Sequence, residues 1–164
     1  MTINLIVSKN YLKYILLGVL LSGLFFQATG QRKKKKQKIE SVIATGRSYI
    51  GTPYKWGGMS RSGIDCSGLI YNSYKTIGVS LPRTAKEQSK TGNKRGWDGI
   101  REGDLVYFKF KKKGDKWYHS GMITYVGEDK ILFVHASSSQ GVVESNLLSD
   151  YYKNNVKNFR RVIK

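Results

Sequence analysis

Apolar residues recur at helical spacing in two segments of the first half of the chain. In the first segment they are Ile39, Val42, Ile43 and Ile50. In the second they are Cys66, Leu69, Ile70, Tyr74 and Ile77. Gly51 and Pro53 end the first segment, whereas Asp65 is a good N-cap and Gly78 a typical terminator for the second. The pattern predicts two helices, with Cys66 in the first turn of the second helix and at the edge of the core.

The second half of the chain has the pattern of β-strands, in which β-branched and aromatic residues lie between glycine-rich or charged turns. The predicted strands are residues 104–110, 117–126, 130–137, 141–145 and 158–163. A charged turn is predicted over residues 111–116. Because the helices precede the strands, we expect an α+β domain whose N-terminal helices pack on one antiparallel β-sheet.

The N-terminal residues 1–30 differ from the rest of the chain. Lys9 and Lys13 precede an apolar run over residues 15–26, and the small residues Ala28 and Gly30 follow it. This order is typical of a secretory signal peptide. A membrane-spanning helix needs roughly 20 apolar residues, so an uncleaved anchor is the weaker alternative and no stable span is expected after cleavage. We expect an exported, periplasmic or extracellular protein, and not a lipoprotein, because no cysteine lies near the cleavage site.

Positive charge dominates the sequence. The net charge is +18, and residues 1–30 contribute two of the positive charges and none of the negative ones, so a chain starting at residue 31 has +16. Residues 31–38 form a basic segment that we expect to be a flexible tail. Such a surface attracts polyanions, which for an exported protein are anionic cell-envelope polymers. The sequence contains no nucleic-acid-binding motif, so no specific nucleic acid partner is expected.

The single cysteine, Cys66, lies between Asp65 and Ser67. One reading is a buried structural cysteine, which behaves as a small apolar residue. The alternative is a nucleophile, because a helix N-terminus lowers a thiol pKa and its free N–H groups can stabilise an oxyanion. The charge of Asp65 opposes this effect unless its carboxylate is engaged in capping or by substrate.

Only two histidines are present, His119 and His135, and both lie in predicted strands. A single strand histidine is often a core residue, but a cysteine hydrolase needs one base and one group that orients it. One cysteine and two histidines are too few for a usual zinc site, so neither a metal nor a cofactor is expected. Across a hairpin closed by residues 127–130, the histidines share a face only with an odd loop or a β-bulge, and we predict one of these.

Six short motifs occur in one order: YKWGG, DCSG, LPRTAKEQ, GDLVYF, HSGM and FVHAS. Together they resemble the landmarks of the NlpC-type cell-wall cysteine peptidases, and the resemblance covers residues 39–164. It implies a papain-like α+β fold with the nucleophile at a helix N-terminus. Members of this family cut peptidoglycan stem peptides, typically between γ-D-glutamate and a diamino acid such as meso-diaminopimelate.

The resemblance also implies roles for individual residues. Cys66 corresponds to the nucleophile that forms a thioester, His119 to the general base, and His135 to the polar residue that orients the base. Tyr54 corresponds to a tyrosine whose hydroxyl lies near the thiol. The residues that correspond to the lining of the substrate cleft are Trp56, Asp65, Ser67 and Ser120, with Asp65 a candidate partner for a free substrate amine.

Two other function classes remain open. One is a catalytically silent module that binds the cell wall, although the intact set of one cysteine and two histidines argues against it. The other is an amidase or acyltransferase acting on a substrate outside the wall, because one fold hosts several chemistries. Residues 96–102 and 111–116 match no landmark of the family.

Overall fold

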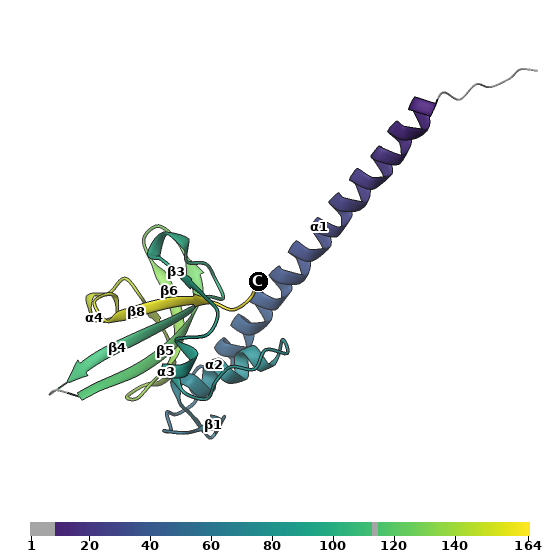
Figure 1. Cartoon of the computed structure of the whole chain (residues 1–164). Coiled ribbons are helices and arrows are strands. Elements are labelled where there is room, and N and C mark those ends of the chain that lie inside the picture. The colour runs from purple at the N-terminus through teal and green to yellow at the C-terminus, as the bar shows by residue number, and fades with distance from the viewer. Residues whose placement is uncertain (1–8, 113–114) are drawn as a thin grey trace, which may run out of the picture. The chain divides into compact units, whose positions relative to one another are not determined.

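The structure is a computed structural model that describes residues 9–112 and 115–164. The chain divides into two units, Met1–Lys36 and Gln37–Lys164. The long helix α1, Lys9–Ser48, contributes residues to both units (Figure 1). Within the predicted charged turn over residues 111–116, residues 113 and 114 lie outside the described part.

The first unit is helical over its described residues, which all belong to α1. The basic segment 31–38, expected as a flexible tail, is also helical. Lysine, arginine and glutamine are good helix formers, which accounts for this difference. Over residues 9–112 and 115–164, no helix combines the length and apolar character required to cross a membrane. A signal peptide over residues 1–30 stays a prediction, and residues 1–8 lie outside the described part.

Two helices of the second unit lie close to the predicted positions, and a third, short helix was not predicted. The end of α1 buries Val42 and Ile43. Helix α2, Cys66–Lys75, begins at the predicted residue, and Gly78 follows it with a φ of 75°, a conformation that favours glycine. A short helix α3, Ala85–Gln88, lies in the motif LPRTAKEQ. The predicted helices are therefore confirmed in this unit.

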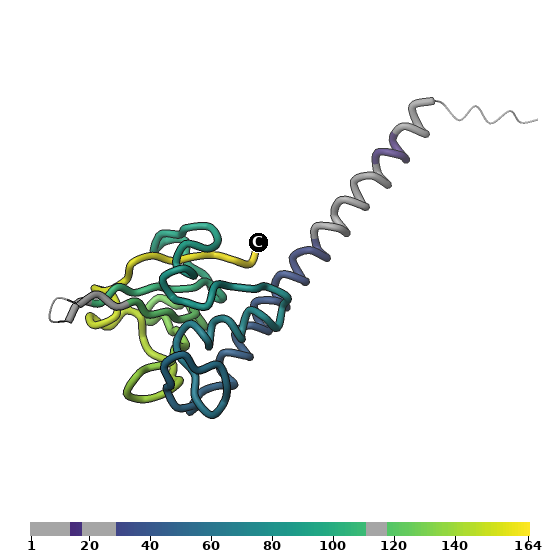
Figure 2. Tube along the Cα trace, turned by 60° about the horizontal axis from the view of Figure 1, so that its bottom comes forward, coloured from purple at the N-terminus to yellow at the C-terminus, as the bar shows by residue number. Residues whose placement is uncertain are grey.

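Six strands form one antiparallel sheet in the order β3-β8-β4-β5-β6-β7. Their bounds are Asn93–Arg95 for β3, Leu105–Lys112 for β4, Asp115–Val126 for β5, Ile131–Ser137 for β6, Gly141–Asn146 for β7 and Val156–Arg161 for β8. The colour along the trace shows that most of the sheet comes from the later part of the chain (Figure 2). The α+β prediction with one main antiparallel sheet is confirmed.

The shortest elements were not predicted from the sequence. They are the hairpin of β1, Met59–Ser60, and β2, Gly63–Ile64, the edge strand β3, the 3₁₀-helix η1, Trp97–Gly99, and helix α4, Asp150–Lys153. Each has too few residues to show an apolar period. The hairpin nevertheless matters for the site, because it precedes α2 and its last residue, Ile64, is fully buried.

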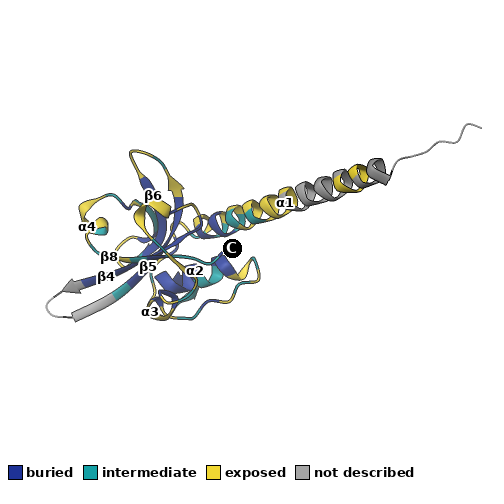
Figure 3. Cartoon of the chain, turned by 45° about the horizontal axis from the view of Figure 1, so that its top comes forward, coloured by how far each residue is buried: buried dark blue, intermediate teal, exposed yellow. Residues whose placement is uncertain are grey.

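The sheet buries apolar side chains on both faces. One face packs against α1 and α2 through residues such as Val42, Leu69 and Met122. The other face holds an aromatic cluster that includes Phe108, Phe133 and Phe159. Buried residues accordingly run along α2 and the central strands in Figure 3. This two-sided burial fixes β5, the strand that carries His119, at the centre of the fold.

A β-bulge in β5 sets the relation between the two histidines. Met122 pairs with Val134 and Ile123 with Phe133, but beyond Thr124 the register shifts by one residue. Residues 127–130 close the hairpin between β5 and β6. A four-residue loop alone would place the histidines on opposite faces, and the bulge restores a common face. The prediction of a bulge or an odd loop is confirmed.

Candidate functional site

The N-terminus of α2 places the only cysteine of the chain. Asp65 is the N-cap, and its Oδ1 accepts a hydrogen bond from the backbone N–H of Gly68 at 2.7 Å. Cys66 is therefore the first helical residue, where backbone N–H groups have no partner within the helix. Its exposure is only 7%. The thiol thus lies at the edge of the core and beside the positive end of the helix dipole, as the sequence predicts.

Arg83 neutralises the charge of Asp65. The guanidinium donates to both carboxylate oxygens, at 2.9 Å from Nη1 to Oδ1 and 2.7 Å from Nη2 to Oδ2. Ser67 Oγ and the Gly57 N–H donate to the same carboxylate. Burial alone would raise the pKa of Asp65, but the hydrogen bonds from Arg83 and Gly68 lower it. Asp65 is consequently ionised and engaged within the protein, and its role toward a substrate amine stays a prediction.

The two histidines form a hydrogen-bonded pair. His119 Nε2 and His135 Nδ1 are 2.9 Å apart, with the rings nearly perpendicular at 89°. The far nitrogen of His135, Nε2, lies 2.9 Å from Ser145 Oγ and 3.3 Å from the hydroxyl of Tyr152. These partners come from β7 and α4, so three elements hold the ring of His135.

Burial keeps both imidazoles neutral. It lowers the pKa of His119 to about 3, with a further contribution from the neighbouring His135. Burial also lowers the pKa of His135 to about 4. Since a neutral imidazole has one N–H and one acceptor nitrogen, one ring donates to the other. The pair is therefore able to take up a proton from a neighbouring group.

The thiol is also neutral in the resting protein. Burial raises the pKa of Cys66, the hydroxyl and backbone N–H of Ser120 lower it, and the charge of Asp65 raises it. Burial has the largest effect. A thiolate thus forms only when a base removes the proton, and this requirement suits a histidine.

Tyr54 adds a hydrogen-bond donor near the thiol. Burial, together with the charges of Cys66 and Asp65, raises the pKa of Tyr54 to about 12. Its hydroxyl therefore keeps its proton at neutral pH. Tyr54 also pairs with Ile64 in an isolated β-bridge, which ties it to the hairpin just before α2.

These groups converge on one cavity of about 1040 Å³, which we call the Cys66 cavity. All the predicted site residues line it except Ser120, namely Tyr54, Trp56, Asp65, Cys66, Ser67, His119 and His135. Ser120 is fully buried instead, because it follows His119 on β5 and adjacent strand residues face opposite sides. Its assignment to the cleft lining stays a prediction.

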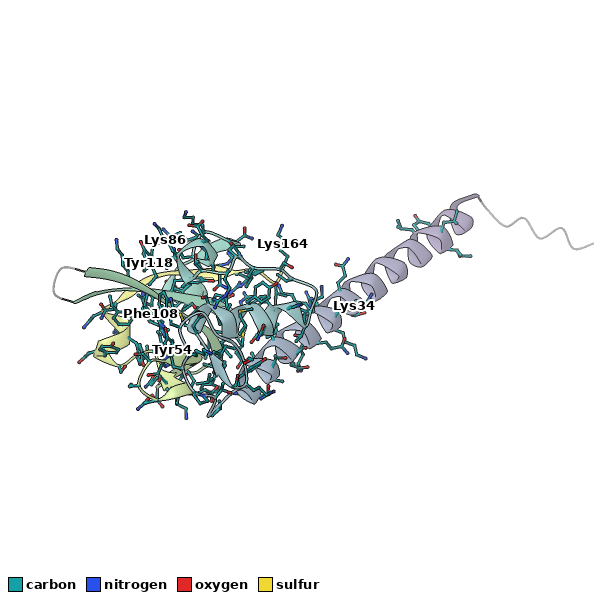
Figure 4. The ribbon with its side chains drawn as sticks, turned by 90° about the horizontal axis from the view of Figure 1, so that it is seen from below. Lys34, Tyr54, Lys86, Phe108, Tyr118 and Lys164 are labelled. Carbon is teal, nitrogen blue, oxygen red and sulfur yellow. The ribbon has the colours of Figure 1, made fainter. Side chains whose placement is uncertain are left out.

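The sequence analysis missed several members of the cavity lining. Tyr54, Lys86 and Tyr118, labelled in Figure 4, enter the lining from three separate segments, and only Tyr54 was predicted. Arg83 and Lys86 are the two basic residues of the motif LPRTAKEQ, so this motif contained the signal from which both could have been predicted. No local sequence pattern marks Ser145 or Tyr152 as a functional residue, because only the tertiary fold brings them to His135. Trp56 lies at the rim with 87% exposure.

Over 9–112 and 115–164, no group of three or more His, Cys, Asp or Glu side chains is placed to hold a metal ion. The chemistry of the cavity is that of a thiol at a helix N-terminus, a histidine on a neighbouring strand and a second polar group that orients this histidine. Fold and site together define a papain-like cysteine hydrolase arrangement.

Comparison with known proteins agrees with this class. The model of the NlpC/P60 family matches residues 51–161. The chain is 39% identical to the γ-D-glutamyl-L-lysine dipeptidyl-peptidase of Bacillus subtilis, over 60% of this chain and 33% of that protein. It is 37% identical to the probable endopeptidase NlpC of Escherichia coli, over 71% of this chain and 73% of that protein. The chain belongs to the NlpC/P60 family.

A solved structure supports the fold. An NlpC/P60 family protein from Bacillus cereus superposes with a TM-score of 0.67 at 30% identity, covering 77% of this chain and 40% of that one. The chain spans about a third of the length of the Bacillus subtilis relative. The predicted family and fold class are confirmed, and the relatives carry the names of peptidases. The bond that is cut, the roles of Cys66, His119 and His135, and export stay predictions.

Proposed function

We propose that this protein is an exported cysteine peptidase that hydrolyses peptidoglycan stem peptides at the bond between γ-D-glutamate and a diamino acid. The observation that carries the proposal is the convergence of Cys66, the histidine pair and Tyr54 on one cavity. Family membership supports the peptidase class. The name of the Bacillus subtilis relative supports the γ-D-glutamyl bond.

In the first half-reaction, His119 takes the proton of the Cys66 thiol and the sulfur attacks the amide carbonyl. The resulting oxyanion accepts hydrogen bonds from the N–H of Cys66 and the hydroxyl of Tyr54. His119 then passes its proton to the departing amine as the C–N bond breaks, which leaves a thioester. In the second half-reaction a water gives a proton to His119 and attacks the thioester, and the acid product leaves as the thiol is restored.

His135 orients and stabilises the base during these steps. Once His119 carries two protons, its Nε2–H donates to Nδ1 of His135, 2.9 Å away. His135 must then carry its own proton on Nε2, where Ser145 Oγ lies at 2.9 Å to accept it. The hydroxyl of Ser145 can accept this proton, so the hydrogen-bond chain accommodates the tautomer of His135 that supports a protonated His119.

Charge in the cavity favours an acidic substrate. The carboxylate of Asp65 is paired with Arg83, whereas Lys86 adds a further positive charge to the lining. A γ-linked D-glutamate keeps its α-carboxylate free, and meso-diaminopimelate brings another carboxylate. We therefore favour meso-diaminopimelate over lysine as the diamino acid.

The test is digestion of purified muropeptides by the full chain, read by mass spectrometry. Two substrate sets differ only in meso-diaminopimelate or L-lysine at the third position, and Cys66→Ala is the matched inactive control. We expect fragments cut after D-glutamate, with the intact cysteine only, and faster from the meso-diaminopimelate set. Products that persist in Cys66→Ala, or no product from either set, would refute the proposal in favour of a binding module or a non-wall amidase.

Export and wall attraction have separate tests. The mass of the protein recovered from the periplasm or the medium should correspond to a chain that begins at Gln31. The basic surface should bind isolated cell walls through anionic polymers, and this binding should weaken steeply with salt. Recovery of the full-length chain from the cytoplasm contradicts the first expectation, and salt-independent binding contradicts the second.

A further inference from the structure

Ser120 has a buried hydroxyl without a good partner in the resting protein. The residue is fully buried at the centre of the sheet, and over the described residues 9–112 and 115–164 its Oγ makes no hydrogen bond of normal geometry; the group it faces is the thiol of Cys66. A buried polar group without a partner loses its hydration and gains nothing in return. Such groups are rare in native proteins, and each calls for a physical explanation.

The position of Ser120 supplies one. Ser120 lies on β5 directly after His119, and its side chain faces the side of the sheet on which α2 packs. Both its hydroxyl and its backbone N–H lie at the thiol of Cys66, where they lower the pKa that burial raises. One dipeptide of β5 thus contributes to the site from both faces of the sheet, with His119 in the cavity lining on one face and the Ser120 hydroxyl at the thiol on the other.

We propose that Ser120 is a further catalytic residue, whose hydroxyl donates a hydrogen bond to the sulfur of Cys66 when the thiol has lost its proton. In the resting state the neutral thiol is a weak acceptor, so the hydroxyl stays without a good partner. In the thiolate the negative sulfur provides that partner, and hydrogen bonds to charged groups are the stronger ones. This role rests on the proposed function only in taking Cys66 as the nucleophile.

The other groups around the thiol do not replace this donor. The charged and titratable side chains that interact with Cys66 or share its cavity are Asp65, Arg83, Tyr54, Tyr107, Lys86, Tyr118, His119, His135, Tyr151 and Tyr152. Asp65 opposes the thiolate, and Arg83 is engaged with Asp65. Tyr107 pairs with Ser120 across the strands, and within the described part of the chain its own buried hydroxyl has no partner, so it must be tested beside Ser120.

The experiment measures the rate at which iodoacetamide alkylates the full chain between pH 6 and 10. Cys66 is the only cysteine, so the mass of the product reports on one site. Ser120→Ala should raise the pKa of the thiol by about one to two pH units, which lowers the alkylation rate at pH 8 about 10- to 100-fold. No substrate is involved, so this result is independent of any peptidase activity.

Thr124→Val is the matched control. Thr124 also lies on β5, and its buried hydroxyl has no partner among the residues that the structure describes. It is four residues beyond Ser120, roughly 13 Å along an extended strand. Its alkylation profile should equal that of the unaltered chain. The thermal midpoint of Ser120→Ala should not fall, because the substitution removes a polar group that the folded resting state leaves unpaired.

Two results overturn the inference. One is a Ser120→Ala profile that coincides with that of the unaltered chain. The other is a rise in the thiol pKa in Tyr107→Phe but not in Ser120→Ala, which would transfer the role to Tyr107. If the unaltered chain cleaves no muropeptide while Ser120→Ala shows the expected slower alkylation, the proposed function fails and the inference on Ser120 stands.

Discussion

Acid should destabilise this protein through its histidine pair. Histidine in an unfolded chain has a pKa of about 6.5, whereas the folded values are about 3 for His119 and about 4 for His135. Below pH 6.5 the unfolded chain therefore binds protons that the folded chain does not. Stability from this source is complete above pH 6.5 and is lost as the pH falls toward 4.

The size of the loss at pH 5 depends little on the exact folded values. Both folded pKa values lie well below 5, so at pH 5 each histidine is protonated in the unfolded chain only. Each therefore lowers the free energy of unfolding by the free energy that corresponds to about 1.5 pH units, which is about 2 kcal/mol. The pair therefore costs about 4 kcal/mol, a large share of the roughly 5–15 kcal/mol that typical domains have. The pKa of Asp65 is lowered, so this carboxylate adds a loss only at more acid pH.

The assay is urea unfolding of the full chain at pH 7.5 and pH 5. The unaltered chain should lose about 4 kcal/mol between these pH values, and His135→Asn about 2 kcal/mol, since only His119 then titrates. Comparing two pH values within each variant cancels any pH-independent cost of the substitution. Equal stability of the unaltered chain at both pH values, or an undiminished acid loss in His135→Asn, would refute the reasoning about neutral buried histidines.

Three further substitutions test the surroundings of the site. Arg83→Met leaves the carboxylate of Asp65 without its cation. It should lower the free energy of unfolding in urea by about 2 kcal/mol, less than for a fully buried pair because the guanidinium is partly exposed. Unchanged stability would contradict this. Ser145→Ala removes the hydroxyl that lies at Nε2 of His135. It should lower kcat/KM on muropeptides about fivefold. An unchanged kcat/KM would count against this role. Gly68→Ala places a Cβ 2.5 Å from a backbone oxygen and should cost about 2 kcal/mol, while Gly99→Ala, with open space around it, should cost much less.

The sequence alone was sufficient for the parts of the site that depend on local rules. Asp65 as an N-cap placed Cys66 at the start of α2, and strand parity required the bulge that the structure has after Ile123. The same parity, applied one residue further, places Ser120 on the opposite face of β5 from His119. The expected flexible tail over residues 31–38 was inferred from charge alone, although its residue types favour helix.

Contacts between residues far apart in the sequence could not be predicted from local sequence rules. Arg83 meets Asp65 across 18 positions and Tyr152 meets His135 across 17, and no local pattern records either pairing. The edge strand β3 has three residues and is defined by its pairing with β8 near the C-terminus. These features depend on the tertiary fold, which brings distant segments of the chain together.

The burial of Cys66 also bears on oxidative damage. Peroxides and electrophiles react with the thiolate and with accessible sulfur, and oxidation beyond the sulfenic acid is mostly irreversible. With 7% exposure and a pKa raised by burial, this sulfur offers little of either form between turnovers. Small nonspecific thiol reagents should consequently be poor inhibitors, whereas an electrophile carried by a substrate-like peptide would reach the sulfur as it becomes reactive.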